Sequence, residues 1–252
     1  MKIIISPAKE MSTENDFIEQ LDTPVLMEYT KPLFEYMKSR SYDELQTILK
    51  CNDKLTKLNY NRYQNGKIDS KLVAALLAYD GIAYKYMAPQ VFTEEEFSYV
   101  NEHLRIISGL YGLLRPMDGI IPYRLEMQAK IDYMSYTNLY EYWKDRIYQV
   151  LVEDSNYIIN LASKEYSKII ETYLSKDVTF VDVIFGEMVN GKLVEKGVYV
   201  KMARGAMVRF MASNNVTSIE ELKTFNELDY TFTEEIKNNN KITLVFLKNT
   251  AL

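Results

Sequence analysis

The stretch Lys2-Ile-Ile-Ile-Ser-Pro-Ala-Lys9 places three isoleucines directly before a serine and a proline. β-branched residues favour strands and proline cannot continue a strand ladder, so the stretch predicts a short buried strand that ends at Ser6. The stretch Tyr157-Ile-Ile-Asn-Leu161 has the same character and leads into a predicted helix that begins at Ser163. These two strands lie early and late in the chain, with helical patterns between them. Together they predict a sheet that is covered by helices.

Polar residues stand at the ends of both predicted strands. If the strands are parallel neighbours, their carboxyl ends meet at one edge of the sheet, where open α/β sheets bind ligands. The residues that this arrangement would bring together are Ser6, Lys9, Asn160 and Ser163. Taken alone, Ser163 is more simply interpreted as a helix N-cap, because a serine side chain accepts hydrogen bonds from first-turn N–H groups.

Apolar periodicity predicts the elements that surround these strands. The pattern is helical from about residue 24 to 79, and a capping box at Thr93–Glu96 opens another helix. The remaining predicted elements are helices over 139–152, 163–173, 201–213 and 219–225, and strands over 178–185, 194–200 and 242–246. We therefore predict an α/β protein of mixed α+β character, a single domain over residues 1–252. Its mixed β-sheet is flanked by helices, and a helical subregion at about 24–107 packs on it.

Composition and charge exclude several classes of protein. The chain has 252 residues, of which 47% are hydrophobic and 26% charged, and its net charge is −5. These values exclude a disordered, coiled-coil or collagen-like chain. No apolar run approaches the roughly 20 residues of a membrane helix, and the first six residues lack a signal-peptide cleavage site. We expect a cytoplasmic protein with no membrane partner, in which any site for a polyanion is a local basic patch.

Cysteine and histidine each occur once, as Cys51 and His103. A single cysteine excludes an intramolecular disulfide, and the two residues are too few for structural zinc, iron–sulfur clusters or haem. The sequence therefore predicts neither a cofactor nor a metal site. A Ser-His-Asp or Cys-His catalytic arrangement would have to use His103, and no other feature supports one, so we interpret His103 as a structural residue.

The segment Lys201–Met211 predicts a helix with one basic face. At 100° per residue its apolar side chains fall on one half of the helix, and its three cations lie within an arc of about 140° on the other half. The cations are Lys201, Arg204 and Arg209, and no acidic residue interrupts them. Gly205 lies on the same face, where the missing side chain lets a backbone or a phosphate come close. The alternative is an ordinary solvated helix face.

A glycine- and proline-rich segment over residues 108–127 is the second candidate site. A predicted helix that ends at Ser108, the Gly109-Leu-Tyr-Gly112 turn and the apolar residues after it resemble the outline of a helix–hairpin–helix. Such a hairpin presents backbone N–H groups to a phosphate. Arg105, Arg115 and Arg124 are spaced through this region, and Tyr123 could stack on a base. The alternative is a rigid packing loop, in which glycine supplies positive φ and proline supplies stiffness.

Taken in order, these motifs resemble the YaaA family of peroxide-stress-resistance proteins. The resemblance rests on Ser6-Pro-Ala-Lys9, on the segment from His103 to Asp118, on Pro122-Tyr-Arg-Leu-Glu-Met127, on Asn160-Leu-Ala-Ser163 with Glu165, Tyr166 and Lys168, and on Lys201 with Ala203-Arg-Gly205 and Arg209.

The resemblance implies a protective role during hydrogen peroxide stress that is linked to limiting free intracellular iron. It also implies a single mixed α/β domain with a helix–hairpin–helix element and a basic cleft that binds duplex or branched DNA, with no cofactor and no established catalytic activity. The DNA- or anion-binding residues that it implies are Lys9, Arg115, Arg124, Lys201, Arg204 and Arg209. The supporting residues are Ser6, Gly109, Gly112, Asn160, Ser163, Lys168 and Gly205.

Two functions compete for this cleft. The first is DNA binding by a cytoplasmic stress-response protein, through phosphate contacts that carry no base information. The second is an enzyme or receptor for a small phosphorylated or nucleotide-like ligand, with Glu126 as an acid or base. Direct iron sequestration is the weakest hypothesis, because ferrous sites use imidazole or several converging carboxylates and the sequence has one histidine and no clustered motif. The oligomeric state is not predicted.

Overall fold

Parallel strands form the centre of the computed structural model, which describes residues 1–12 and 21–249. β1 (Lys2–Ile5) lies between β5 (Leu104–Ser108) and β10 (Tyr157–Leu161), and all four of its residues are buried. The register places Ile5 opposite Leu161. The strand that ends at Ser6 and the strand at 157–161 are therefore parallel neighbours, which is the condition for the expected site at their carboxyl ends.

The sheet continues on both sides of these three strands. On one side, β11 (Thr179–Val189) pairs with β10 and β14 (Lys241–Lys248) pairs with β11, both in parallel. The edges are antiparallel, with β13 (Tyr230–Asn238) beside β14, β6 (Gly112–Leu114) beside β5, and β12 (Lys192–Val194) on the far end of β11. The result is a mixed sheet of order β13-β14-β11-β10-β1-β5-β6.

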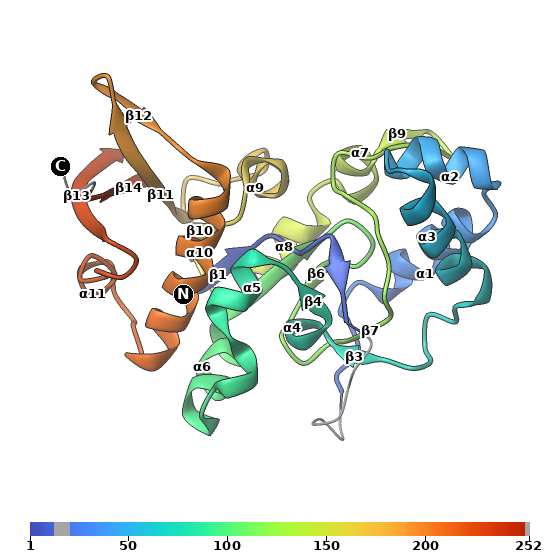
Figure 1. Ribbon diagram of the computed structural model, residues 1–252, viewed down its shortest axis with the longest axis horizontal. Coiled ribbons are helices and arrows are strands. Elements are labelled where there is room, and N and C mark those ends of the chain that lie inside the picture. Colours follow the sequence, from blue (N-terminus) through green and yellow to red (C-terminus); the bar gives the residue numbers. More distant parts are fainter. Residues whose placement is uncertain (13–20, 250–252) are drawn as a thin grey trace.

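Helices cover this sheet, and three of them pack closely together. These are α5 (Ile82–Met87), α6 (Glu94–His103) and α10 (Gly197–Ser213). The predicted capping box opens α6, since Thr93 accepts from the N–H of Glu96 while the Glu96 carboxylate accepts from the N–H of Thr93. The first helices, α1 (Met27–Lys38), α2 (Tyr42–Leu49) and α3 (Asp53–Asn65), lie at the opposite end of the molecule from β11–β14 (Figure 1).

Short elements complete the chain. The remaining helices are α4 (Ala75–Ala78), the 3₁₀ turn η1 (Pro89–Val91), α7 (Leu139–Trp143), α8 (Arg146–Val152), α9 (Lys164–Glu171) and α11 (Ile219–Leu222). The remaining strands form two-residue to four-residue pairs: β2 (Glu10–Met11) with β4 (Tyr79–Asp80), β3 (Val73–Ala74) with β7 (Gly119–Ile120), and β8 (Lys130–Tyr133) with β9 (Tyr136–Asn138). Within residues 1–12 and 21–249, no helix combines the length and the apolar character of a membrane span.

The glycine-rich segment does not form a helix–hairpin–helix. The helix predicted to end at Ser108 ends at His103 instead, and residues 104–108 form the sheet strand β5, which turns directly into β6. This also shortens the predicted helical subregion, whose helices stop at residue 103. The glycines serve packing: a Cβ on Gly109 would lie 2.2 Å from the Leu125 carbonyl oxygen, and Gly112 has a φ of +74°. Gly109 and Gly112 thus have the close packing and the positive φ that the rigid-loop interpretation expects.

Three other element predictions need correction. The helix predicted over 139–152 is two helices, because Lys144 between them has a φ of 49°. The strand predicted over 194–200 ends at Val194, and α10 begins at Gly197. The edge strand β13 was not predicted, and its largely exposed residues explain why no apolar pattern marks it.

The order of the strands places a ligand crevice beside β1. From β1 the chain crosses to β5 on one side, whereas from β10, on the other side, it continues outward to β11. When the connections after two neighbouring strands run in opposite directions, a crevice forms at the carboxyl ends of those strands. Open α/β sheets bind their ligands in such crevices. In this protein the crevice lies at the carboxyl ends of β1 and β10.

Candidate functional site

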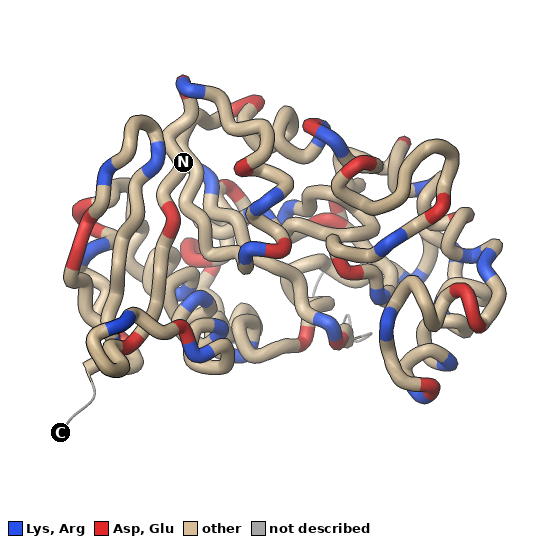
Figure 2. The backbone as a smooth tube through the Cα atoms, turned by 90° about the horizontal axis from the view of Figure 1, so that it is seen from above, with Lys and Arg blue, Asp and Glu red and all other residues tan. Residues whose placement is uncertain are grey.

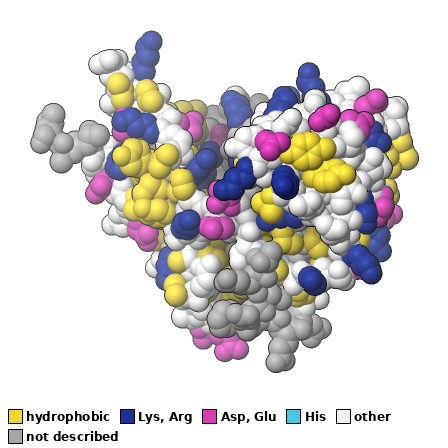
Figure 3. Space-filling model, turned by 45° about the vertical axis from the view of Figure 1, so that its right-hand side comes forward, with side chains coloured by type: hydrophobic (Ala, Val, Ile, Leu, Met, Phe, Trp, Pro, Cys, Tyr) yellow, Lys and Arg dark blue, Asp and Glu magenta, His cyan; other side chains and the backbone are white. Residues whose placement is uncertain are grey.

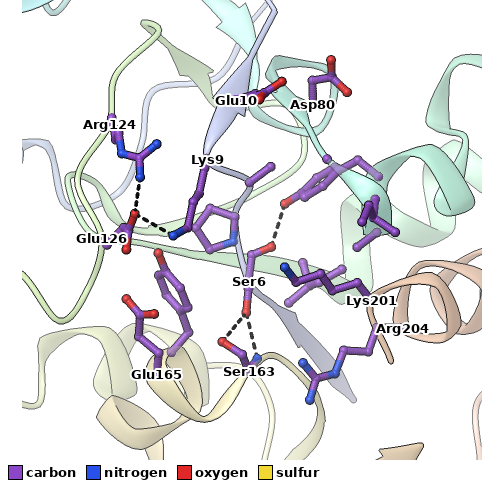
Figure 4. Close-up of a pocket in the computed structure, with 18 of the residues that line it drawn as sticks. Ser6, Lys9, Glu10, Asp80, Arg124, Glu126, Ser163, Glu165, Lys201 and Arg204 are labelled. Carbon is purple, nitrogen blue, oxygen red and sulfur yellow. Dashed lines mark hydrogen bonds and ion pairs between the residues drawn. The ribbon is translucent and has the colours of Figure 1, made fainter. Parts of the chain in front are cut away.

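A pocket of about 420 Å³ occupies this crevice, within the size range of small-molecule sites. Five segments line it: residues 5–10 after β1, residues 80–85 at the start of α5, residues 123–126, the start of α9, and α10 (Figure 4). They are distant in sequence, and the carboxyl ends of β1 and β10 bring them together. The pocket therefore lies where the pairing of the two strands predicts a site.

Two serines join the strand ends at the floor of the pocket. The backbone N–H of Ser163 donates to Ser6 Oγ at 2.8 Å, and Ser6 Oγ donates to Ser163 Oγ at 3.2 Å. Tyr84 from α5 donates to the Ser6 carbonyl oxygen at 3.1 Å. Ser163 is the N-cap residue of α9, as the alternative interpretation predicts, but its side chain makes no cap hydrogen bond. The first-turn N–H groups of α9 therefore lack that partner.

Ser6→Ala tests this connection. The variant removes the acceptor of the Ser163 N–H, so we expect the free energy of unfolding to fall by about 1 kcal/mol and the melting temperature to fall by about 2–4 °C. Thermal unfolding measures the change. Ser135→Ala is the control, because Ser135 is exposed and has no hydrogen bond to another described residue. Equal melting temperatures for both variants would contradict the structural role of Ser6.

Two cations and a carboxylate form a network on one wall. Glu126 Oε1 accepts from Arg124 Nη2 at 2.8 Å and pairs with Lys9 Nζ at 3.1 Å. Lys9 is largely exposed, whereas the Arg124 side chain is only 10% exposed. The Nε atom of Arg124 is buried and has no hydrogen-bond partner among the described residues. Three residues that the sequence singles out thus lie together, and the acid neutralises part of the basic charge.

Glu165 adds a second carboxylate beside this network. It lies in the first turn of α9 and accepts a hydrogen bond from the Gln128 N–H at 3.2 Å. Burial raises the pKa of Glu165 above its ordinary value, and the negative charge of Glu126 raises it further, while the backbone hydrogen bond opposes both. No ion pair within 4.0 Å joins Glu165 to another described residue, but the more distant charge of Lys9 also opposes the rise of its pKa.

Lys201 and Arg204 project from α10 into the pocket from the other side (Figure 4). Neither has an ion pair or hydrogen bond to another described residue, and the Nε atom of Arg204 is buried without a partner. Burial lowers the pKa of Arg204, and the more distant charges of Glu195 and Asp182 oppose that shift. Arg204 is therefore a desolvated cation without an acceptor from the described part of the chain.

Gly205 holds the helix that carries these cations against α5. A Cβ at this position would lie 1.9 Å from the Ala83 carbonyl oxygen and 2.7 Å from its carbonyl carbon. The sequence predicts that a backbone or a phosphate comes close to Gly205, and it is the backbone of α5 that does so. Lys201 and Arg204 are therefore kept at a fixed distance from the α5 wall of the pocket.

Two of the six predicted cations lie outside the pocket. The Arg115 guanidinium pairs with Asp118 at 2.8 Å and donates to the Thr23 carbonyl oxygen at 3.1 Å. Asp118 is fully buried, so Arg115 compensates a structural charge. Arg209 stacks over the Phe92 ring, 5.8 Å from its centroid, and donates to backbone carbonyl oxygens at the end of α5.

Two of the supporting residues are also used within the fold. Asn160 donates to Asp182 Oδ1 at 2.8 Å and accepts from the Ala162 N–H at 2.9 Å, so it shapes the end of β10 without lining the pocket. Lys168 lies over the Tyr140 ring, 4.9 Å from the centroid. Of the candidate site residues that the sequence singles out, the structure gathers in the pocket Ser6, Lys9, Tyr123, Arg124, Glu126, Ser163, Lys201 and Arg204.

The pocket is mixed in charge. Its lining includes five cations, Lys9, Lys85, Arg124, Lys201 and Arg204, and four acids, Glu10, Asp80, Glu126 and Glu165. The same mixture extends over the molecule, where acidic and basic positions are interspersed along the chain (Figure 2) and share the face shown in Figure 3. In the part of the chain that the structure describes, no group of three or more His, Cys, Asp and Glu side chains could hold a metal ion.

Sequence reasoning missed Glu165, Asp80 and Lys85 as pocket residues. Asp80 and Lys85 form an ion pair at 3.3 Å on the α5 wall. Glu165 stands two residues after a predicted N-cap, where an acid is ordinarily interpreted as a partner of the helix dipole. Its place directly after the Asn160–Ser163 motif is the signal that could have marked it.

Two relatives match the chain over nearly its whole length. A UPF0246 protein of Desulfitobacterium hafniense is 51% identical over 248 residues, which are 98% of this chain and 98% of that protein. A UPF0246 protein of Agathobacter rectalis is 48% identical over 241 residues, covering 96% of this chain and 97% of the relative. The family model described as "Peroxide stress protein YaaA" matches residues 1–236. The chain therefore belongs to the YaaA (UPF0246) family of peroxide stress proteins, the family that its motifs resemble.

Proposed function

We propose that the protein acts in the peroxide stress response by binding a small phosphorylated ligand in the pocket between β1, α9 and α10. Family membership supports the stress-related role. One observation carries the choice of ligand. The only buried side-chain nitrogen or oxygen atoms without a partner, among the described residues, are the Nε atoms of Arg124 and Arg204, and both arginines line this pocket. A buried N–H group without an acceptor is unfavourable for a cation, and an anion held against the same guanidinium group offsets that cost.

The chemistry around Arg204 fits a phosphate. Lys201 supplies a second cation from the same helix, and the N-terminal end of α9, with Ser163 and Glu165, lines the pocket. Helix N-termini and guanidinium groups are the two commonest ways in which proteins hold phosphate oxygens. The hydroxyl groups of Ser6 and Ser163 lie between these groups (Figure 4) and add hydrogen-bonding capacity.

The dimensions favour a small ligand over a duplex. A volume of about 420 Å³ suits a molecule of up to nucleotide size. The four acids in the lining would repel a continuous phosphate backbone. Arg115 and Arg209, which a duplex would need in addition, are committed to contacts within the fold.

A ligand screen tests the proposal. We expect phosphorylated compounds of nucleotide size or smaller to raise the melting temperature, because a ligand at 100 times its Kd stabilises the folded state by about 2.7 kcal/mol. Lys201→Met should weaken binding by about fivefold, the effect of removing one exposed charge contact of about 1 kcal/mol. Lys192→Met, an exposed lysine outside the pocket, is the control and should bind as the wild type does. If ribose phosphates, nucleoside monophosphates and inorganic phosphate all leave the melting temperature unchanged, the proposal is wrong.

DNA binding stays a prediction. The cations of this pocket limit the number of phosphate contacts that DNA could make there. Of the predicted cations, four line the pocket. Four phosphate contacts give a log–log salt slope of about −3.6, at −0.9 for each contact. Titration of duplex and four-way-junction DNA in increasing salt is the measurement. Strong binding that is insensitive to Lys201→Met would place a DNA partner elsewhere on the surface and separate it from this pocket. The cytoplasmic location and the link to iron likewise stay predictions.

A further inference from the structure

We infer that the ligand of this pocket is a phosphorylated amine, with its phosphate on the α10 side and a protonated amino group on the side of Glu126 and Glu165. The inference rests on the proposed function, because it takes the phosphate subsite from it.

The charges are divided between two walls. In Figure 4, Lys201 and Arg204 lie on one side, Glu126 and Glu165 lie on the other, and Ser6 and Ser163 lie between them. The α10 wall has two cations and no acid among the lining residues. A ligand that lies across the serines therefore meets two cations at one end and two carboxylates at the other, of which Glu126 is already paired with Lys9 and Arg124.

Most charges in the rest of the lining are paired. Apart from Lys201 and Arg204, the lining has three cations, Lys9, Lys85 and Arg124, against four acids, Glu10, Asp80, Glu126 and Glu165. Two ion-pair groups account for most of these charges: Asp80 with Lys85 at 3.3 Å, and Glu126 with Lys9 at 3.1 Å and with Arg124 at 2.8 Å. Glu10 is exposed to solvent, which screens its charge. One half-buried carboxylate, Glu165, remains without an ion pair.

Glu165 is the acidic counterpart of Arg204. Each is a partly or largely desolvated charge that lines the pocket, and neither has an ion-pair partner within 4.0 Å among the described residues. Leaving such a group unpaired is unfavourable, and a ligand charge of opposite sign removes the penalty. A phosphate would supply the negative charge and the hydrogen-bond acceptors that Arg204 lacks. An ammonium group, with three N–H donors and a positive charge, meets the need of Glu165 and can also reach Glu126.

Other ligand ends fit this wall less well. A second phosphate or a carboxylate would be repelled by Glu165, which has no ion pair within 4.0 Å among the described residues. A hydroxyl group would donate one hydrogen bond and leave the charge of Glu165 uncompensated. An apolar group would bury the carboxylate further without a partner.

A matched series of compounds tests the inference. The probes are ω-aminoalkyl phosphates with two, three and four carbons, each compared with the alkyl phosphate of the same length, by isothermal titration at pH 7.5. We expect the best aminoalkyl phosphate to bind at least tenfold more tightly than its alkyl partner. In Glu165→Gln this ratio should fall to about one. The control is Glu153→Gln, an exposed acid outside the pocket, which should keep the wild-type ratio.

The outcomes separate the inference from the proposed function. If alkyl and aminoalkyl phosphates bind the wild type equally, the amine assignment is overturned and the phosphate site stands. If alkyl phosphates bind more tightly, the assignment is likewise overturned. If no member of either series binds, the proposed function itself fails and the inference fails with it. A tenfold preference that survives in Glu165→Gln would show that another group selects the amine.

Discussion

Gly205→Ala should lower the free energy of unfolding by about 3 kcal/mol, at the upper end of the usual cost of overpacking a core. The added Cβ would meet the backbone of Ala83 at 1.9 Å, and a backbone cannot rotate away as a flexible side chain can. For a chain of this size the melting temperature should fall by about 6–12 °C. Because α10 must shift away from α5, ligand binding should weaken as well, and both effects are read from thermal unfolding with and without ligand.

Gly197→Ala is the matched control on the same helix. No atom lies within 4 Å of a Cβ built at Gly197, and the residue is the first of α10. Alanine is a better helix former than glycine, so this variant should be as stable as the wild type or slightly more stable. A Gly205→Ala protein that melts with the control would show that α5 and α10 do not pack as closely as the structure describes.

Arg204→Met should weaken the binding of a phosphorylated ligand by about 100-fold, which corresponds to about 2.7 kcal/mol. That is the usual range for removing one partner of a desolvated, hydrogen-bonded charge pair. The free protein should be as stable as the wild type or more stable, because methionine replaces a desolvated cation that has no acceptor among the described residues. Titration measures the first effect, and thermal unfolding without ligand measures the second.

Arg209→Met separates this result from a general change in α10. Arg209 lies on the same helix, but its guanidinium contacts the carbonyl oxygens of Met87 and Ala88 and the Phe92 ring. This control should lose about 1 kcal/mol of stability and keep the affinity for the ligand. If Arg204→Met destabilises the free protein and leaves binding intact, Arg204 is a structural residue and the phosphate subsite is wrongly placed.

The centre of the fold and the place of the site follow from short-range sequence signals. Runs of β-branched residues before Ser6 and at 157–161 identify buried strands. Once the structure shows that these strands are parallel, the general rule for their carboxyl ends places the ligand crevice. The basic face of α10 follows from helical periodicity, which brings Lys201 and Arg204 to one side.

The rest depends on contacts between distant residues. Glycines in a sheet turn and in a helix–hairpin–helix look alike in sequence, because both supply positive φ or close packing, and only the pairing of β5 with β6 distinguishes them. Periodicity also cannot show that Arg115 is held by Asp118 and the Thr23 carbonyl oxygen. From the sequence alone, a lysine or arginine therefore looks available to bind a ligand even where it forms an ion pair within the fold.

The contact of Gly205 with Ala83 also bears on how a ligand is received. Where two backbones touch without an intervening side chain, the helices cannot slide past one another, so α5 and α10 behave as one rigid body. This wall of the pocket is therefore preorganised, and little conformational entropy is lost when a ligand binds to it.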